Sequence, residues 1–168
     1  MMKQIATIFA IGLLLSEPSS ADEFCDSLLR VVDDAGSGFA HVRGKKESDM
    51  PRYDNGLTLP GASEYLVVVG GVASPQSSCA VTPNPEGAKT WRYMCEFPDP
   101  QRQKDAQTEQ EIEAHLDACL IHLQKKARKF IDSSWPYSAT TTRSRIQFGP
   151  GYDGGVLRYY LAIDQKAL

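Results

Sequence analysis

The sequence predicts a single α+β domain, in which a mainly antiparallel sheet of about five to six strands carries two helices on one side and is held by two disulfides. Two segments show the apolar periodicity of an amphipathic helix, several short segments show the apolar runs or alternation of strands, and four cysteines lie among them. The strands are grouped between and after the helices and do not alternate with them. This order favours an antiparallel sheet over a parallel one.

The overall composition is that of an ordinary globular protein. The chain has 168 residues, a formal net charge of −3 and 42% hydrophobic residues, which fits one packed domain and argues against disorder. Nucleic-acid recognition needs a dense basic footprint, which this acidic balance does not provide. We therefore expect no nucleic-acid partner.

Residues 1–21 have the features of a cleaved signal peptide. A basic residue precedes the apolar run Ile5–Leu15, and the small residues Ser19 and Ala21 stand at positions −3 and −1 of a predicted cleavage site. The run is shorter than the roughly 20 residues that cross a membrane. We expect a single domain over residues 22–168 that is periplasmic or secreted, with no stable membrane insertion after cleavage.

The first expected helix covers Phe24–Ala35, with Gly36 just beyond its end. Its apolar stripe consists of Cys25, Leu28, Leu29 and Val32. Asp33 and Asp34 lie at the helix exit. Two neighbouring carboxylates could bind a cation or act in acid–base chemistry. We favour the simpler interpretation that both are solvated.

The next segments are expected to form a short strand, a long loop and a buried strand. Phe39–Val42 is the strand candidate, and Arg43–Gly61 is polar and interrupted by glycine and proline, as in a surface loop. Tyr65–Val69 is a continuous apolar run, which is typical of a central strand covered on both faces.

A hairpin is expected from Ser77–Thr82 and Lys89–Phe97, with the turn over Pro83–Gly87. A register symmetric about Gly87 places Cys79 opposite Cys95, because both cysteines lie eight residues from that glycine. We therefore predict a cross-strand disulfide between them. All four cysteines follow the signal segment, and an even number of cysteines in an oxidising compartment indicates two disulfides.

The second helix is predicted over Gln107–Phe130, and Thr108 with Glu111 forms a capping box at its start. Its apolar stripe consists of Ile112, Leu116, Cys119, Leu120, Leu123, Ala127 and Phe130. Cys25 and Cys119 each lie in the apolar stripe of a helix. If the two stripes pack together these cysteines come close, so we predict a Cys25–Cys119 disulfide.

The chain is expected to end in a hairpin of Thr140–Phe148 and Val156–Ile163, joined by a glycine-rich loop over Gly149–Gly155. Aligning the apolar residues of the two strands on one face leaves a polar set on the other. That exposed set comprises Arg143, Arg145, Arg158 and Tyr160. Arginine and tyrosine are enriched in protein interfaces, so this face is the predicted partner-binding surface.

Patterns of catalysis and metal binding are weak in this sequence. Glu111 and His115 have i, i+4 spacing, but there is no HExxH motif, and His122 lies seven residues further along, roughly 10 Å at 1.5 Å per residue. No GxSxG motif follows a predicted strand. We therefore expect no catalytic residues, no metal and no cofactor.

These observations predict an exported, non-catalytic binding or inhibitor module. Its partner would be a protein or another anionic polar molecule, contacted through the face of the C-terminal hairpin. One alternative is a small secreted hydrolase with a site assembled around His115 or His41. A second alternative is a structural component of the cell envelope.

Overall fold

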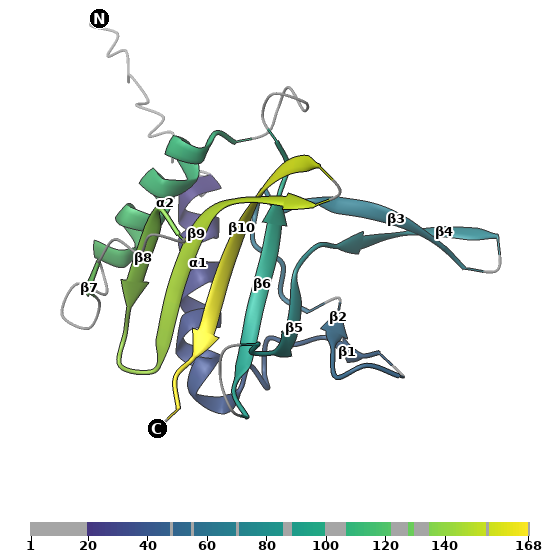
Figure 1. Ribbon diagram of the computed structural model, residues 1–168, viewed down its shortest axis with the longest axis horizontal. Coiled ribbons are helices and arrows are strands. Elements are labelled where there is room, and N and C mark those ends of the chain that lie inside the picture. Colours follow the sequence, from purple (N-terminus) through teal and green to yellow (C-terminus); the bar gives the residue numbers. More distant parts are fainter. Residues whose placement is uncertain are drawn as a thin grey trace, which may run out of the picture.

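The computed structural model describes residues 20–47, 49–54, 56–69, 71–85, 89–99, 107–121, 128–129, 135–153 and 155–167. Over these residues the fold is α+β: two helices pack on one face of an antiparallel sheet, and a separate hairpin projects from the body (Figure 1). The predicted fold class is confirmed.

The described elements follow one another in this order: α1 (Ser20–Asp34), a 3-10 turn η1 (Ala35–Ser37), β1 (Lys45–Lys46), β2 (Tyr53–Asp54), β3 (Glu64–Val69), β4 (Val72–Ser77), β5 (Ala80–Pro83), β6 (Trp91–Phe97), α2 (Glu109–Ile121), β7 (Arg128–Lys129), β8 (Tyr137–Thr140), β9 (Ser144–Asp153) and β10 (Val156–Gln165). The main sheet has the strand order β1-β2-β5-β6-β10-β9-β8-β7 in the described part of the chain. It is wider than expected, because β1, β2 and β7 are two-residue strands from segments predicted as loop or helix.

The core lies between the helices and the inner face of the sheet. Leu28 of α1 and Leu116 of α2 are fully buried, and Phe97 and Phe148 meet edge to face beneath them. Apolar side chains packed in this way are the main source of stability in a domain of this size. The inner face of the sheet thus forms one side of the core.

Both predicted disulfides are confirmed: Cys25 bonds to Cys119, and Cys79 to Cys95. The first joins α1 to α2. The second joins β6 to the residue just before β5, and the register of these strands pairs Ala80 with Met94, as the predicted symmetry about Gly87 requires. Gly87 itself lies outside the described residues. Two disulfides in one small domain are typical of a protein that folds in an oxidising compartment outside the cytoplasm.

The second helix is shorter than predicted. Its start is as expected, because the Thr108 amide donates to Glu111 Oε2 at 2.7 Å and the Glu111 amide to Thr108 Oγ1 at 3.3 Å. Arg128 and Lys129, predicted to be helical, instead form β7 and pair with β8, whose edge offers backbone hydrogen bonds. Residues 122–127 and Phe130 of the predicted helix lie outside the described residues.

The first helix also ends differently. The turn η1 continues it, and the left-handed residue is Gly38, with φ of 69°, and not the expected Gly36. Phe39 also has a positive φ, of 64°, so Phe39–Val42 is a tight return loop and not the predicted strand. The Asp34 carboxylate holds this loop.

The last hairpin is longer than predicted. Residues expected in the glycine-rich loop continue β9 to Asp153, and β10 starts at Val156. A Cβ on Gly149 would lie 2.6 Å from Pro136 Cδ, and one on Gly151 would lie 2.8 Å from Tyr160 Cε2. These two glycines therefore allow close packing on the sheet rather than a turn.

The prediction of a central strand at Tyr65–Val69 is wrong. Strand β3 pairs with β4 in a separate two-stranded sheet, which extends away from the body at the right of Figure 1. Leu66 is 70% exposed and Val72 is 69% exposed. An apolar run indicates that a strand favours burial, but it does not indicate which surface of the protein or of a partner would bury it.

Candidate functional site

The face of the main sheet that points away from the helices is called the outer face here, and it carries the predicted binding residues. The strand register places Arg145 opposite Asp164, and Tyr160 opposite both Gly149 and Glu96. Arg158 lies two residues before Tyr160, on the same side of β10. The structure therefore brings Arg145, Arg158 and Tyr160 to one face, as the alternation predicted.

Arg143 does not join this group. It precedes β9 in a turn, and its Cδ lies 2.9 Å from the position of a Cβ built on Gly36 in η1. Its side chain thus packs at the end of the first helix. The predicted strand began at Thr140, four residues too early, because β9 begins only at Ser144.

Ion pairs connect the strands of the outer face. The Arg92 guanidinium donates to both carboxylate oxygens of Asp164, with Nε–Oδ1 at 2.5 Å and Nη2–Oδ2 at 3.0 Å. Arg158 forms an ion pair with Glu96. Together with Arg145, these five side chains comprise three cations and two anions, so the group carries a net positive charge.

Two polar side chains lie beside these charged groups, one on β9 and one on the next strand, β8. Gln147 on β9 is paired in register with Ser138 on β8, and both are buried. Gln147 Oε1 and Ser138 Oγ make no hydrogen bond within the described structure. Buried polar atoms usually have partners, so such a pair requires an explanation. Gln147 lies two residues from Arg145 in β9 and therefore faces the same side, but β8 gave no strand signal in the sequence and Ser138 was missed.

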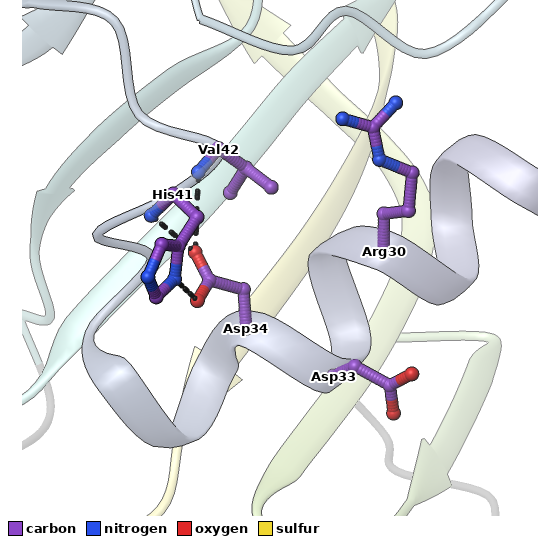
Figure 2. Close-up of a pocket in the computed structure, with 5 residues that line it drawn as sticks. All are labelled: Arg30, Asp33, Asp34, His41 and Val42. Atoms are coloured by element: carbon purple, nitrogen blue, oxygen red, sulfur yellow. Dashed lines mark hydrogen bonds and ion pairs between the residues drawn. The ribbon is translucent and has the colours of Figure 1, made fainter.

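A second polar cluster lies where α1 ends, beside a shallow cavity of about 340 Å³ lined by Arg30, Asp33, Asp34, His41 and Val42. Figure 2 shows the Asp34 side chain turned toward the return loop and the Asp33 side chain turned away from it. Asp34 accepts hydrogen bonds from the backbone amides of His41 at 2.7 Å and Val42 at 3.1 Å. It also accepts one from the Ser37 hydroxyl.

The Asp34 carboxylate also contacts the imidazole of His41, with Nδ1 2.6 Å from Oδ1. Burial raises the pKa of Asp34, but its hydrogen bonds with His41, Ser37 and Val42 outweigh this effect and hold the pKa below the ordinary value. The ionised carboxylate requires Nδ1 to carry a proton. The prediction of a solvated acid is therefore wrong for Asp34, whereas Asp33 is exposed as expected.

Asp34→Asn is expected to lower the free energy of unfolding by about 1–3 kcal/mol at neutral pH, since the charged acceptor of several hydrogen bonds is lost. The folded-state pKa is below the ordinary 3.8. The contribution is therefore present above that value and is lost as the pH falls through the lowered pKa. Urea unfolding at neutral and acidic pH measures it. The control is exposed Asp33→Asn, and an equal effect of both variants would refute the role of Asp34.

The remaining histidine of the described residues is part of the packing. The ring centroid of His115 lies 5.6 Å from that of Phe24, and its Nδ1 is 3.3 Å from Gln107 Nε2. Glu111, four residues earlier, belongs to the capping box. Within the described ranges, no three histidine, cysteine, aspartate or glutamate side chains gather as metal ligands. His122 lies outside those ranges.

Comparison with models of known protein families, with curated proteins and with solved structures finds no match to this chain. Neither described helix is long and apolar enough to cross a membrane.

Proposed function

We propose that the protein is an exported, non-catalytic binding or inhibitor module whose outer sheet face contacts a protein or another anionic polar partner. The predicted signal peptide and the two disulfides support export to an oxidising compartment. On the outer face, arginine supplies charge-assisted hydrogen bonds to carboxylates, and Tyr160 supplies a large rigid contact surface.

The observation that carries the proposal is the pair Gln147 and Ser138. Their buried oxygens have no hydrogen-bond partner among the described residues, and an unsatisfied buried polar group costs about 1–3 kcal/mol. A polar partner that reaches these oxygens would supply the missing hydrogen bonds. Arg145 lies two residues from Gln147 on the same strand face and would direct an anionic group to this place.

Two arginines that differ in position provide the test. Arg145→Ala on the outer face should reduce capture of the partner about tenfold, which corresponds to about 1.4 kcal/mol, whereas Arg143→Ala beside Gly36 should leave it unchanged. Residues 22–168 would be used as bait on envelope extract, with bound proteins quantified by mass spectrometry and bait stability checked by thermal unfolding. Equal capture by both variants would refute the outer face as the binding site.

A specific contact also favours a second candidate, the small hydrolase around His41. Its ring is 82% exposed and Asp34 holds Nδ1, so Nε2 of the neutral ring is an acceptor that could take a proton from water. Ser37 bonds to Asp34 and does not act as a nucleophile for this ring. Hydrolysis of chromogenic ester substrates that is abolished by His41→Ala would favour this candidate. A wild-type chain without such hydrolysis would argue against it.

A further inference from the structure

The hairpin β3–β4, called the arm here, exposes side chains that proteins normally cover. Tyr65 is 42% exposed and Leu66 is 70% exposed, and Val72 near the tip is 69% exposed. Tyr65 and Leu66 are neighbours on one strand, so they point to opposite faces of the arm. Both faces therefore expose large apolar side chains to solvent, which is typical of a contact surface.

The base of the arm is fixed to the body, which gives the arm a defined direction. The Ser63 amide donates to the Glu96 carbonyl at 2.7 Å, and the Ser78 amide donates to the Ser63 carbonyl at 2.9 Å. The Ser78 hydroxyl also donates to the Glu96 carbonyl, at 2.8 Å. The arm is thus a continuation of the fold and is positioned to meet a partner.

The two long edges of the arm are not equivalent. Pro75 in β4 lies opposite Leu66 in β3. Because proline has no amide proton, this pair belongs to the positions whose backbone groups point away from the partner strand. The free edge of β4 therefore lacks a donor at Pro75. The free edge of β3 presents the amide and carbonyl of Leu66, together with those of Glu64 and Val68 two residues to either side.

The edges of the main sheet are built differently. It ends at one side in β1, which is Lys45–Lys46, and at the other side in β7, which is Arg128–Lys129. Short edge strands made of basic residues discourage pairing with another chain. Strand β3 has six residues and its only charge is Glu64 at the base. Among the described strands, both edges of the main sheet are thus protected and the edge of β3 is open.

We propose that two copies of this chain associate through the free edges of β3, which pair antiparallel across a two-fold axis near Leu66. No charged residue occurs from Tyr65 to Ser77, so two arms meet without charge repulsion, as a self-complementary contact requires. The result is a four-stranded sheet with β3 strands at its centre. Pro75 limits further addition at the outer edges, so the assembly stops at the dimer.

Light scattering with size-exclusion chromatography on residues 22–168 tests this proposal. The wild-type chain is expected at twice the mass of one chain. Leu66→Lys places two like charges at the axis and should give a monomer. Ala73→Lys is the control, because Ala73 lies on the same face but in β4, and it should remain a dimer. A wild-type monomer at all concentrations, or equal dissociation by both variants, would overturn the proposal.

A cross-link provides an independent measurement. All four native cysteines are in disulfides, so Leu66→Cys would add a single thiol. Directly opposed residues of hydrogen-bonded antiparallel strands have Cα atoms about 5.5 Å apart, within disulfide reach. Oxidation should therefore give covalent dimers of Leu66→Cys and not of Ala73→Cys. In dimers of a different geometry, oxidation would cross-link both Leu66→Cys and Ala73→Cys or neither of them. Either result would contradict pairing through β3.

Discussion

Replacing Cys25 and Cys119 together with alanine is expected to lower the free energy of unfolding by about 4–5 kcal/mol. Replacing Cys79 and Cys95 should lower it by about 3 kcal/mol. In the chain-entropy model a disulfide acts on the unfolded state, and its effect grows with the logarithm of the loop it closes. The two loops span 94 and 16 residues. The longer loop therefore contributes more.

Urea unfolding of the two double variants measures these changes, and pairwise replacement avoids leaving a free thiol. A small domain has a total stability of about 5–15 kcal/mol, so loss of the Cys25–Cys119 bond would leave it close to unfolding. A larger loss for the Cys79–Cys95 pair would contradict this account.

The parts of the fold predicted correctly from the sequence depend on local periodicity. The apolar stripe of α2 located Ile112, Leu116 and Cys119 in the core, and all three are buried. Combining that stripe with the one on α1 was enough to choose the Cys25–Cys119 pairing. The symmetric hairpin likewise determined the second disulfide. For the α2 stripe and for both disulfides, residues that share one face of a predicted helix or hairpin also pack against one another in the structure.

The predictions from sequence were wrong where the local structure depends on contacts with residues that are distant along the chain. Asp34 has the appearance of a solvated acid at a helix end, and only the return of the chain seven residues later brings the His41 amide to its carboxylate. The run Tyr65–Val69 has the composition of a buried strand, yet no described strand other than β4 pairs with it. The β-propensity of a segment indicates that it favours a strand, but it does not identify the strand with which that segment pairs.

The outer face was predicted only in part, because the sequence shows the alternation within a strand but not the register between strands. The alternation in β9 and β10 correctly grouped Arg145, Arg158 and Tyr160, since side-chain direction in a strand follows from sequence position. Ser138 and Glu96 reach that face from other strands, and their register is set by the assembled sheet. The ion pairs and the unsatisfied atoms therefore became visible only in three dimensions.

A second large change in the free energy of unfolding is expected when the ion pair of Arg92 and Asp164 is broken. Asp164→Ala is expected to lower the free energy of unfolding by about 3–5 kcal/mol, because the Asp164 side chain is 5% exposed and that of Arg92 is 11% exposed. Removal of the carboxylate leaves two arginines, Arg92 and Arg145, facing one another across β10. Their charges are then no longer offset by the acid between them.

Arg92→Ala should cost less than Asp164→Ala, since Asp164 retains Arg145 opposite it on β9. Urea unfolding of the two single variants and of Arg92→Ala with Arg145→Ala tests this asymmetry. The double variant should lose more than the sum of its single variants, because either arginine alone can partly compensate the buried carboxylate. Strict additivity would mean that Arg145 gives Asp164 no support.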